Sequence, residues 1–388
     1  MIDLTKRNLT TKTMRAITMQ VHRRHVLRGG SALLASSALA SIASAQSVVD
    51  DAIFVPTSGK WRAYEIRTTI EIAGQAGDAQ AWIPIADFAD DGWMRPGRAT
   101  WELSAGQAEI VRDAKSGAAM VHARWTGGPP AKIEVVNQFS GRDRAVSTTE
   151  RSAAALPPAQ RSLYTSATEL IRLDGIVKET ADHITTGATT DVDKAQRIYD
   201  WIVDNTFRDP KTRGCGIGDV ESMLKTGNLG GKCADLNALF VGLARAAGLP
   251  ARDLYGIRVA PSSFGYKSLG ANSATITKAQ HCRAEVHLEG VGWLPVDPAD
   301  VRKVVLEEPP GTLSVTHPKV TAARKALFGA WETNWLAYND AHDVMLPGSK
   351  GPAVPFLMYP QAETVAGRLD PLEPDTFKYT ITAREIHT

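Results

Sequence analysis

A glycine pair followed by a cysteine at the start of a predicted helix is the strongest chemical signal in the sequence. Gly230 and Gly231 precede Cys233, and residues 233–247 place apolar side chains at helical spacing. A cysteine in the first turn of a helix lies among N–H groups without intrahelical acceptors, which favour the thiolate. The glycines let the backbone approach closely and leave room for a substrate beside the sulfur. A buried structural cysteine at a helix start is the alternative interpretation.

A histidine and an aspartate can complete a catalytic group with this cysteine. His281 begins a predicted strand, and Asp297 ends the next strand after a turn at residues 289–292. An antiparallel pair of this kind can place an imidazole beside a carboxylate, which orients the ring and stabilises its charged form. A thiol on a helix, with its base and orienting acid on an adjoining hairpin, is the general triad arrangement. A structural histidine and a turn aspartate before Pro298 are the ordinary alternatives for the two residues taken alone.

Four segments that contain these residues, taken together, resemble the transglutaminase-like superfamily. They are Gly-Gly-Lys-Cys-Ala-Asp at 230–235, Leu-Ala-Arg-Ala-Ala-Gly-Leu-Pro-Ala-Arg at 243–252, His-Cys-Arg-Ala-Glu-Val-His-Leu at 281–288 and Gly-Trp-Leu-Pro-Val-Asp-Pro at 292–298. The resemblance covers about residues 191–301 and implies an α+β fold with a papain-like core, of the bacterial cysteine protease or amidase type. It implies Cys233 as the nucleophile, His281 as general base and acid, and Asp297 as the residue that orients the histidine.

The chemistry that the resemblance implies is thiol attack on a peptide or amide carbonyl, which forms a thioester acyl-enzyme. Water would complete hydrolysis and an amine would complete transamidation, whereas a non-catalytic binding or scaffold protein would use the same fold without turnover. Family members usually have an alanine and an aromatic residue after the histidine. This chain has Cys282 and Arg283 there, so we expect a changed wall beside the base. The N–H of Cys233 is the expected first oxyanion donor, and the second is open between Asn205, Asn228 and a backbone group.

We expect neither a metal nor a cofactor at this site. Cys282, His281 and His287 could suggest zinc, but no Cys-x-x-Cys or His-Glu-x-x-His motif accompanies them. Cys215 and Cys282 could form a disulfide that leaves Cys233 free, although strand alternation is equally consistent with a buried thiol at Cys282. The expected partner is a peptide or protein substrate, for which cell-wall peptide is one candidate.

The periodic patterns predict a β-rich part followed by the part that carries the chemistry. Residues 46–150 alternate in short runs separated by glycine and aspartate clusters, which predicts a β-rich domain. Residues 151–310 are assigned to the catalytic domain, with predicted helices at 162–173, 176–185 and 191–205 and a glycine-rich mobile loop at 213–231. Residues 311–388 are expected to pack on the catalytic domain as an extension, with a helix at 322–335 and a last strand at 377–386.

Residues 1–45 have the features of a twin-arginine export signal. Arg23 and Arg24 precede a weakly apolar stretch at 29–40, and Ala-Ser-Ala at 43–45 supplies a small-residue cleavage pattern. We therefore expect a periplasmic protein that begins near Gln46 after cleavage. The 388-residue chain has a formal net charge of +2, but without residues 1–45 it holds 37 basic and 41 acidic residues. This balance argues against nucleic-acid binding, and no apolar run is long enough for stable insertion in a membrane.

Overall fold

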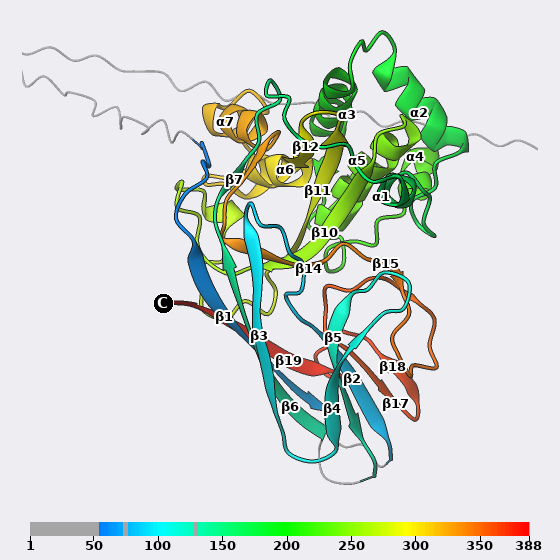
Figure 1. Ribbon diagram of the computed structural model, residues 1–388, viewed down its shortest axis with the longest axis vertical. Coiled ribbons are helices and arrows are strands. Elements are labelled where there is room, and N and C mark those ends of the chain that lie inside the picture. The colour runs from blue at the N-terminus through cyan, green and yellow to red at the C-terminus, as the bar shows by residue number, and fades with distance from the viewer. Residues whose placement is uncertain (1–53, 73–76, 128–130, 388) are drawn as a thin grey trace, which may run out of the picture. The chain divides into compact units, whose positions relative to one another are not determined.

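Two antiparallel sheets form the β-rich part of the computed structural model, which describes residues 54–72, 77–127 and 131–387 (Figure 1). The first sheet has the order β19-β1-β6-β3, with β1 (Arg62–Ile72), β3 (Met94–Leu103), β6 (Ala131–Gly141) and β19 (Lys378–Ile386). The second has the order β18-β17-β2-β5-β4, with β2 (Ala79–Pro84), β4 (Gln107–Arg112), β5 (Ala119–Trp125), β17 (Gln361–Thr364) and β18 (Gly367–Leu369). The predicted export signal at residues 1–45 lies outside the described residues.

Apolar side chains from both sheets pack into one core between them. Ile70 on β1, Ile133 on β6, Ala81 on β2 and Val121 on β5 belong to this core and are buried. Strand β6 alternates between buried and more exposed positions along its length, as expected for a strand with one face on a core. The two sheets therefore form a β-sandwich.

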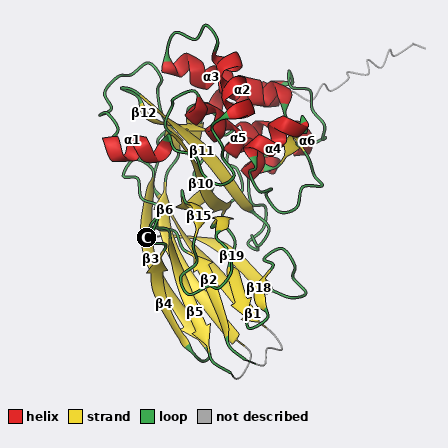
Figure 2. Ribbon diagram, turned by 90° about the vertical axis from the view of Figure 1, so that its right-hand side faces the viewer, coloured by secondary structure: helices red, strands yellow, loops and turns green. Residues whose placement is uncertain are grey.

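A third antiparallel sheet and a set of helices form the remaining part. The sheet has the order β12-β11-β10-β14, with β10 (Ala251–Arg258), β11 (Gln280–Leu288), β12 (Gly292–Val296) and β14 (Trp335–Asn339). Helix α5 (Cys233–Ala246) packs against β10 and β11, and also contacts α2 (Gly175–Thr185) and α3 (Asp191–Asn205). Figure 2 shows these helices grouped beside the sheet. Every residue of α5 is buried, as its apolar character requires. The predicted α+β fold is confirmed.

The smaller elements connect these layers. The other helices are α1 (Pro158–Tyr164), α4 (Val220–Thr226), α6 (Pro298–Glu307), α7 (Pro318–Ala326) and a 3-10 turn at Lys267–Leu269. The short strands are β7 (Arg144–Ala145), β8 (Phe207–Arg208), β9 (Gly230–Gly231), β13 (Ala330–Trp331), β15 (His342–Val344) and β16 (Val354–Phe356).

The C-terminal segment contributes to both parts of the molecule, in contrast to the predicted extension at residues 311–388. Strands β17 and β19 pair with β2 and β1 of the sandwich, whereas β14 pairs with β10 of the third sheet. Pairing satisfies backbone groups that a sheet edge would leave open. Local patterns do not show which distant edge a strand joins, so the sequence could not assign this segment.

Two predicted helices are shorter than expected, and the predicted loop at 213–231 contains a helix. Helix α1 ends at Tyr164, and α7 ends at Ala326. After α7 the chain turns to strands, because Trp331 and Trp335 pack with Trp93 in the core; such tertiary packing overrides helix propensity. Residues 220–226 form α4, whose N-cap Asp219 accepts a hydrogen bond from the N–H of Ser222 over 2.9 Å.

Within residues 54–72, 77–127 and 131–387, no helix combines the length and apolar character needed to cross a membrane.

Candidate active site

Cys233 is the first residue of α5 and lies in the wall of a cavity. The N–H of Lys232, the N-cap residue, donates to the Asp235 carboxylate over 3.0 Å. The N–H of Ala234 donates to the carbonyl of Cys215 over 2.9 Å, so the preceding segment fixes the first turn of the helix. The N–H of Cys233 has no acceptor within its own helix, because of its place in the first turn. It can therefore donate to an oxyanion formed beside the sulfur.

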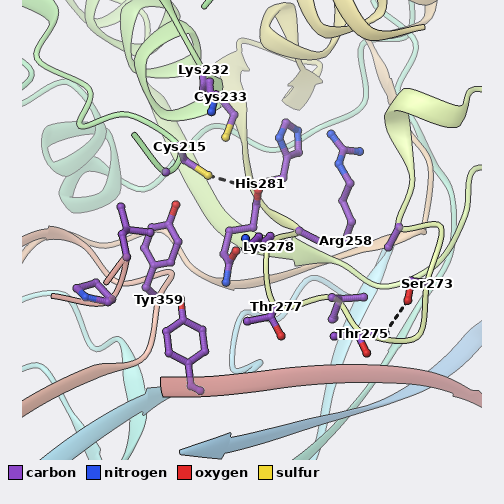
Figure 3. Close-up of a pocket in the computed structure, with 18 of the residues that line it drawn as sticks. Cys215, Lys232, Cys233, Arg258, Ser273, Thr275, Thr277, Lys278, His281 and Tyr359 are labelled. Carbon is purple, nitrogen blue, oxygen red and sulfur yellow. Dashed lines mark hydrogen bonds between the residues drawn. The ribbon is translucent and has the colours of Figure 1, made fainter. Parts of the chain in front are cut away.

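His281 and Asp297 meet as the hairpin pattern predicts. His281 lies near the start of β11, Asp297 directly follows β12, and Nε2 of the imidazole is 2.8 Å from Oδ2 of the carboxylate. Asp297 is also the N-cap of α6 and accepts a hydrogen bond from the N–H of Asp300 over 3.0 Å. Because Nε2 faces Asp297, Nδ1 is the ring nitrogen that is free to serve the thiol. Figure 3 shows the Cys233 sulfur and the His281 ring beside each other at the cavity.

A second carboxylate, which sequence reasoning missed, also contacts the histidine. Oδ2 of Asp300 lies 3.4 Å from Nε2 of His281, and Oδ1 is 2.5 Å from the guanidinium of Arg258. Asp300 lies three residues after Asp297, one turn into α6. This spacing places both carboxylates on one face of the helix and was the signal from which the second carboxylate could have been predicted. The imidazole therefore faces two carboxylates, and the buried Arg258 balances the charge of Asp300.

An amide from α5 connects the helix to this carboxylate pair. Nδ2 of Asn237 donates to the carbonyl of Cys282 over 2.8 Å and lies 3.3 Å from Oδ1 of Asp297. Asn237 is fully buried and lies one helical turn after Cys233. These bonds fix the distance between the helix that carries the thiol and the hairpin that carries the base.

The surrounding charges favour an ion pair between Cys233 and His281. Burial and the charge of Arg258 lower the pKa of His281, but Asp300 and Asp297 outweigh them, and the pKa is raised above its ordinary value. The neighbouring thiols of Cys215 and Cys282 lower the pKa of Cys233 well below its ordinary value, against the effect of burial, and His281 lowers it further. A thiolate beside an imidazolium is the protonation state that these two directions support.

The three cysteines of the chain are all free and buried, and two of them flank the third. Interaction with Cys233 and burial raise the pKa of Cys215 well above its ordinary value, and burial together with Cys233 does the same for Cys282. The thiol of Cys215 donates to the carbonyl of Gln280 over 3.4 Å. Cys215 and Cys282 are thus neutral neighbours of the thiolate, and the disulfide considered from the sequence is absent from the described residues.

The cavity has a volume of about 680 Å³ and holds Cys233, Cys215 and His281 in one wall (Figure 3). Residues 270–280, which lead into β11, form a second wall. A third wall comes from the C-terminal segment, through Tyr359, Leu372 and Tyr379 among others. This third wall could not be predicted from local sequence patterns, since it depends on strand pairing between distant segments.

Neither of the asparagines considered as oxyanion donors lines the cavity. Nδ2 of Asn205 donates to the carbonyl of Trp201 over 2.8 Å, and Oδ1 of Asn228 accepts from the N–H of Gly230 over 3.2 Å. Gln280 does line it, is buried, and has a side-chain nitrogen without a hydrogen-bond partner among the described residues. The position of Gln280 directly before His281 was the only signal in the sequence that its amide would reach the cavity.

From the sequence we expected Arg283 to form part of the wall beside the base. The structure instead places Arg283 behind the base. It is buried, stacks over the ring of Trp335 at 4.7 Å from the centroid, and has Nε 3.6 Å from Oδ2 of Asp297. His281 and Arg283 are two residues apart on β11, so their side chains leave the same face of the sheet. The long side chain of Arg283 therefore reaches the same Asp297 carboxylate as His281. Arg283 contributes a positive charge to Asp297 and does not line the cavity.

One group of side chains in the described part of the chain is close enough to hold a metal ion, namely His281, Asp297 and Asp300. Arg258 and Arg283 already contact the two carboxylates. A divalent cation would have to displace or oppose these guanidinium groups, whereas a protonated imidazole fits between the carboxylates. The donor set therefore suits a proton on His281 better than a metal ion.

Comparison with known proteins places this geometry in a family context. Residues 178–298 match the model of the transglutaminase-like superfamily. An uncharacterised protein from Haemophilus influenzae is 36% identical over 342 residues, which span 83% of this chain and 91% of that protein. Among solved structures, a protein from Cytophaga hutchinsonii proposed to be a cysteine protease has a TM-score of 0.48 at 13% identity, covering 85% of this chain and 100% of that one. The periplasmic domain of TgpA from Pseudomonas aeruginosa has a TM-score of 0.33 at 15% identity, covering 72% and 96%.

Proposed function

Because this chain belongs to the transglutaminase-like superfamily, we propose that it is a cysteine hydrolase that cleaves a peptide or amide bond through an acyl-enzyme on Cys233. One observation carries the proposal: Cys233 at the start of α5 shares a cavity with His281, whose Nε2 is 2.8 Å from Asp297. The superfamily includes thiol-dependent hydrolases and transamidases, and the choice of water as acceptor is part of the proposal.

In the proposed reaction, the Cys233 thiolate attacks the carbonyl carbon, and the carbon–oxygen π electrons move to the oxygen. The N–H of Cys233 donates to this oxyanion. As the tetrahedral intermediate collapses, the carbon–nitrogen bond breaks and His281 gives its proton to the leaving amine. Water then attacks the thioester while His281 takes its proton, and the carboxylic acid leaves as the Cys233–carbon bond breaks. Asp297 holds the imidazole through Nε2 and stabilises its charged form in both steps.

The first test is alkylation of the folded protein by iodoacetamide across a pH series, with modified cysteines mapped by mass spectrometry. Cys215 and Cys282 are built-in controls, because the pKa of each is raised whereas that of Cys233 is lowered. We expect labelling of Cys233 alone, persisting well below pH 8. A Cys233→Ala variant should lose all turnover and keep nearly the same melting temperature, since it removes a small side chain at a cavity wall.

Other results would contradict the catalytic assignment. Equal labelling of the three thiols, or none in the folded state, would indicate an inert site and favour a binding protein. Residual turnover in Cys233→Ala together with a large loss of stability would show that the cysteine is structural. Formation of a stable amide product only when a primary amine is added would replace hydrolysis by transamidation.

We also propose that the protein acts in the periplasm, on the basis of Arg23, Arg24 and the cleavage pattern at residues 43–45. In a bacterial host, the wild-type chain should appear in the periplasmic fraction at the size expected for cleavage near Gln46. A variant with both arginines changed to lysine should remain uncleaved in the cytoplasm. Cleavage that does not depend on the arginine pair would overturn the proposed route.

A further inference from the structure

Among the described residues, those that line the cavity include cationic side chains and no carboxylate. Six lysine and arginine side chains line it, namely Arg208, Arg213, Lys232, Arg258, Lys278 and Lys303. They come from segments far apart in the sequence, so this charge is a property of the folded molecule. The chain outside residues 1–45 is slightly acidic. The charge of the cavity walls is therefore opposite in sign to the net charge of this part of the chain.

Nearby carboxylates balance only part of this positive charge. Glu307 is shared by Arg208 and Lys303, with 3.7 Å to the lysine. Asp370 is 2.8 Å from Arg213, and Asp300 is 2.5 Å from Arg258. Three carboxylates therefore serve four of the six cations.

The two remaining lysines have no carboxylate partner among the described residues. Nζ of Lys232 donates to the carbonyl of Thr212 over 2.7 Å, which leaves its charge unbalanced. Lys278 is exposed and has neither an ion pair nor a side-chain hydrogen bond within the part of the chain that the structure describes. Figure 3 shows Lys232 beside Cys233, and Lys278 on the segment that leads into His281. The two unbalanced cations thus come from different walls of the cavity, Lys232 from the start of α5 and Lys278 from residues 270–280.

Lys303 adds a third cation whose charge an anionic ligand would stabilise. Its side chain is largely buried in the cavity wall, and burial together with the charge of Arg258 lowers its pKa to about 8. An anion in the cavity would offset this repulsion. A cationic site with few counter-charges concentrates anionic ligands, because low-dielectric walls focus the field.

The remaining wall is apolar and comes from the C-terminal segment. Leu372, Phe377 and Tyr379 line it, together with Pro371 and Pro374. An apolar wall opposite a polar and cationic one is typical of a site that binds a ligand by both features. A peptide can supply both, with carboxylates directed to the lysines and an apolar side chain on the other wall.

We infer that the substrate is an acidic peptide, with carboxylates on both sides of the bond that Cys233 attacks. The inference rests on the proposed function for the place of the scissile bond. The negative charge of the groups that flank this bond is inferred from Lys232 and Lys278, which have no carboxylate partner among the described residues. Neutral or basic peptides would leave these lysines unpaired in the complex and would bind more weakly.

Binding can be tested apart from turnover in the Cys233→Ala variant, which keeps every cationic side chain of the cavity. The probes are fluorescein-labelled hexaglutamate and hexaglutamine, with binding followed by anisotropy at low and at physiological ionic strength. We expect tighter binding of hexaglutamate, and a loss of this preference as salt is added. Adding Lys278→Glu should weaken binding of hexaglutamate by roughly two- to fivefold, the value of one lost exposed ion pair, and should leave binding of hexaglutamine unchanged.

Lys132→Glu is the matched control, because it makes the same change of charge at an exposed lysine on β6, outside the cavity. Equal binding of the two peptides, binding of neither, or equal effects of Lys132→Glu and Lys278→Glu would overturn the inference.

The wild-type enzyme is then given peptides that differ only by glutamate or glutamine beside the scissile bond. Preference for hexaglutamate without any Cys233 thioester would refute the proposed hydrolysis and leave the anion site standing. Cleavage of both peptides at equal kcat/KM would refute the acidic preference alone.

Discussion

At the scale of single residues, the reactivity of Cys233 depends on side chains from several elements. Cys215 precedes α4, Cys282 and His281 lie on β11, and Asp300 lies on α6. Each of them changes the balance between thiol and thiolate or between imidazole and imidazolium. A pH profile of activity reports this balance directly, because kcat/KM requires the thiolate and the imidazolium together.

Asp300 should control the alkaline limb of that profile. The pKa of His281 is raised, and Asp300 contributes through its charge at 3.4 Å. Asp300→Asn removes a negative charge that favours the imidazolium and leaves Arg258 unbalanced, so both effects lower the pKa of His281. We therefore expect the alkaline limb of kcat/KM to move to lower pH. An unchanged limb, with iodoacetamide labelling showing an intact Cys233, would mean that Asp300 serves only the structure of α6.

At the scale of elements, the start of α5 is held by a carboxylate that binds three backbone N–H groups. Oδ1 of Asp235 accepts from the N–H groups of Ile217 and Gly218, each over 3.0 Å, and Oδ2 accepts from the N–H of Lys232 over 3.0 Å. Gly216 has a φ of +88°, and a Cβ there would lie 1.9 Å from the Asp235 carboxylate. Asp235 thus acts as a structural anchor, and the segment at 213–218 is fixed against the helix start.

Asp235→Ala should therefore affect both stability and reactivity. Loss of the acceptor for three N–H groups is expected to lower the free energy of unfolding by about 1–3 kcal/mol. It should also slow the alkylation of Cys233, because Cys215 and the first turn lose their support. Asp219→Ala is the matched control, since it removes a cap of α4 at a cost of about 1 kcal/mol without touching α5. If the two variants alkylate at the same rate as the wild type, the anchor does not position the thiol.

At the scale of the whole molecule, the last strand joins the sandwich to the wall of the cavity. The N–H of Ile276 donates to the carbonyl of Ile381 over 2.8 Å, and the N–H of Ala383 donates to the carbonyl of Ala274 over 2.9 Å. Oγ1 of Thr277 accepts from the N–H of Ile381 over 2.9 Å. The segment that leads into His281 is therefore attached to β19, which pairs with β1 at the other end of the chain.

Thr277→Ala tests this connection without removing a strand. Loss of the two hydrogen bonds between Oγ1 of Thr277 and the backbone of Ile381 should cost about 1–2 kcal/mol of stability. We also expect kcat/KM to fall, because residues 270–280 line the cavity. Thr380→Ala is the control, since Thr380 is an exposed residue of the same strand. Equal kcat/KM values for the two variants would show that the link to β19 has no part in the reaction.

The sequence alone determined the chemical group and the local elements that carry it. Helix α5, the hairpin of β11 and β12 and the positions of Cys233, His281 and Asp297 follow from short-range patterns, because capping, periodicity and turn residues act within a few positions. The roles of the three residues stay predictions until the experiments above are done. Only the tertiary structure decided that Asp300 and two further thiols surround the site, that Arg283 lies behind the carboxylate, and that β19 closes the cavity. These features depend on contacts between distant segments and on burial, which set charge balance and strand pairing and leave no local signal in the chain.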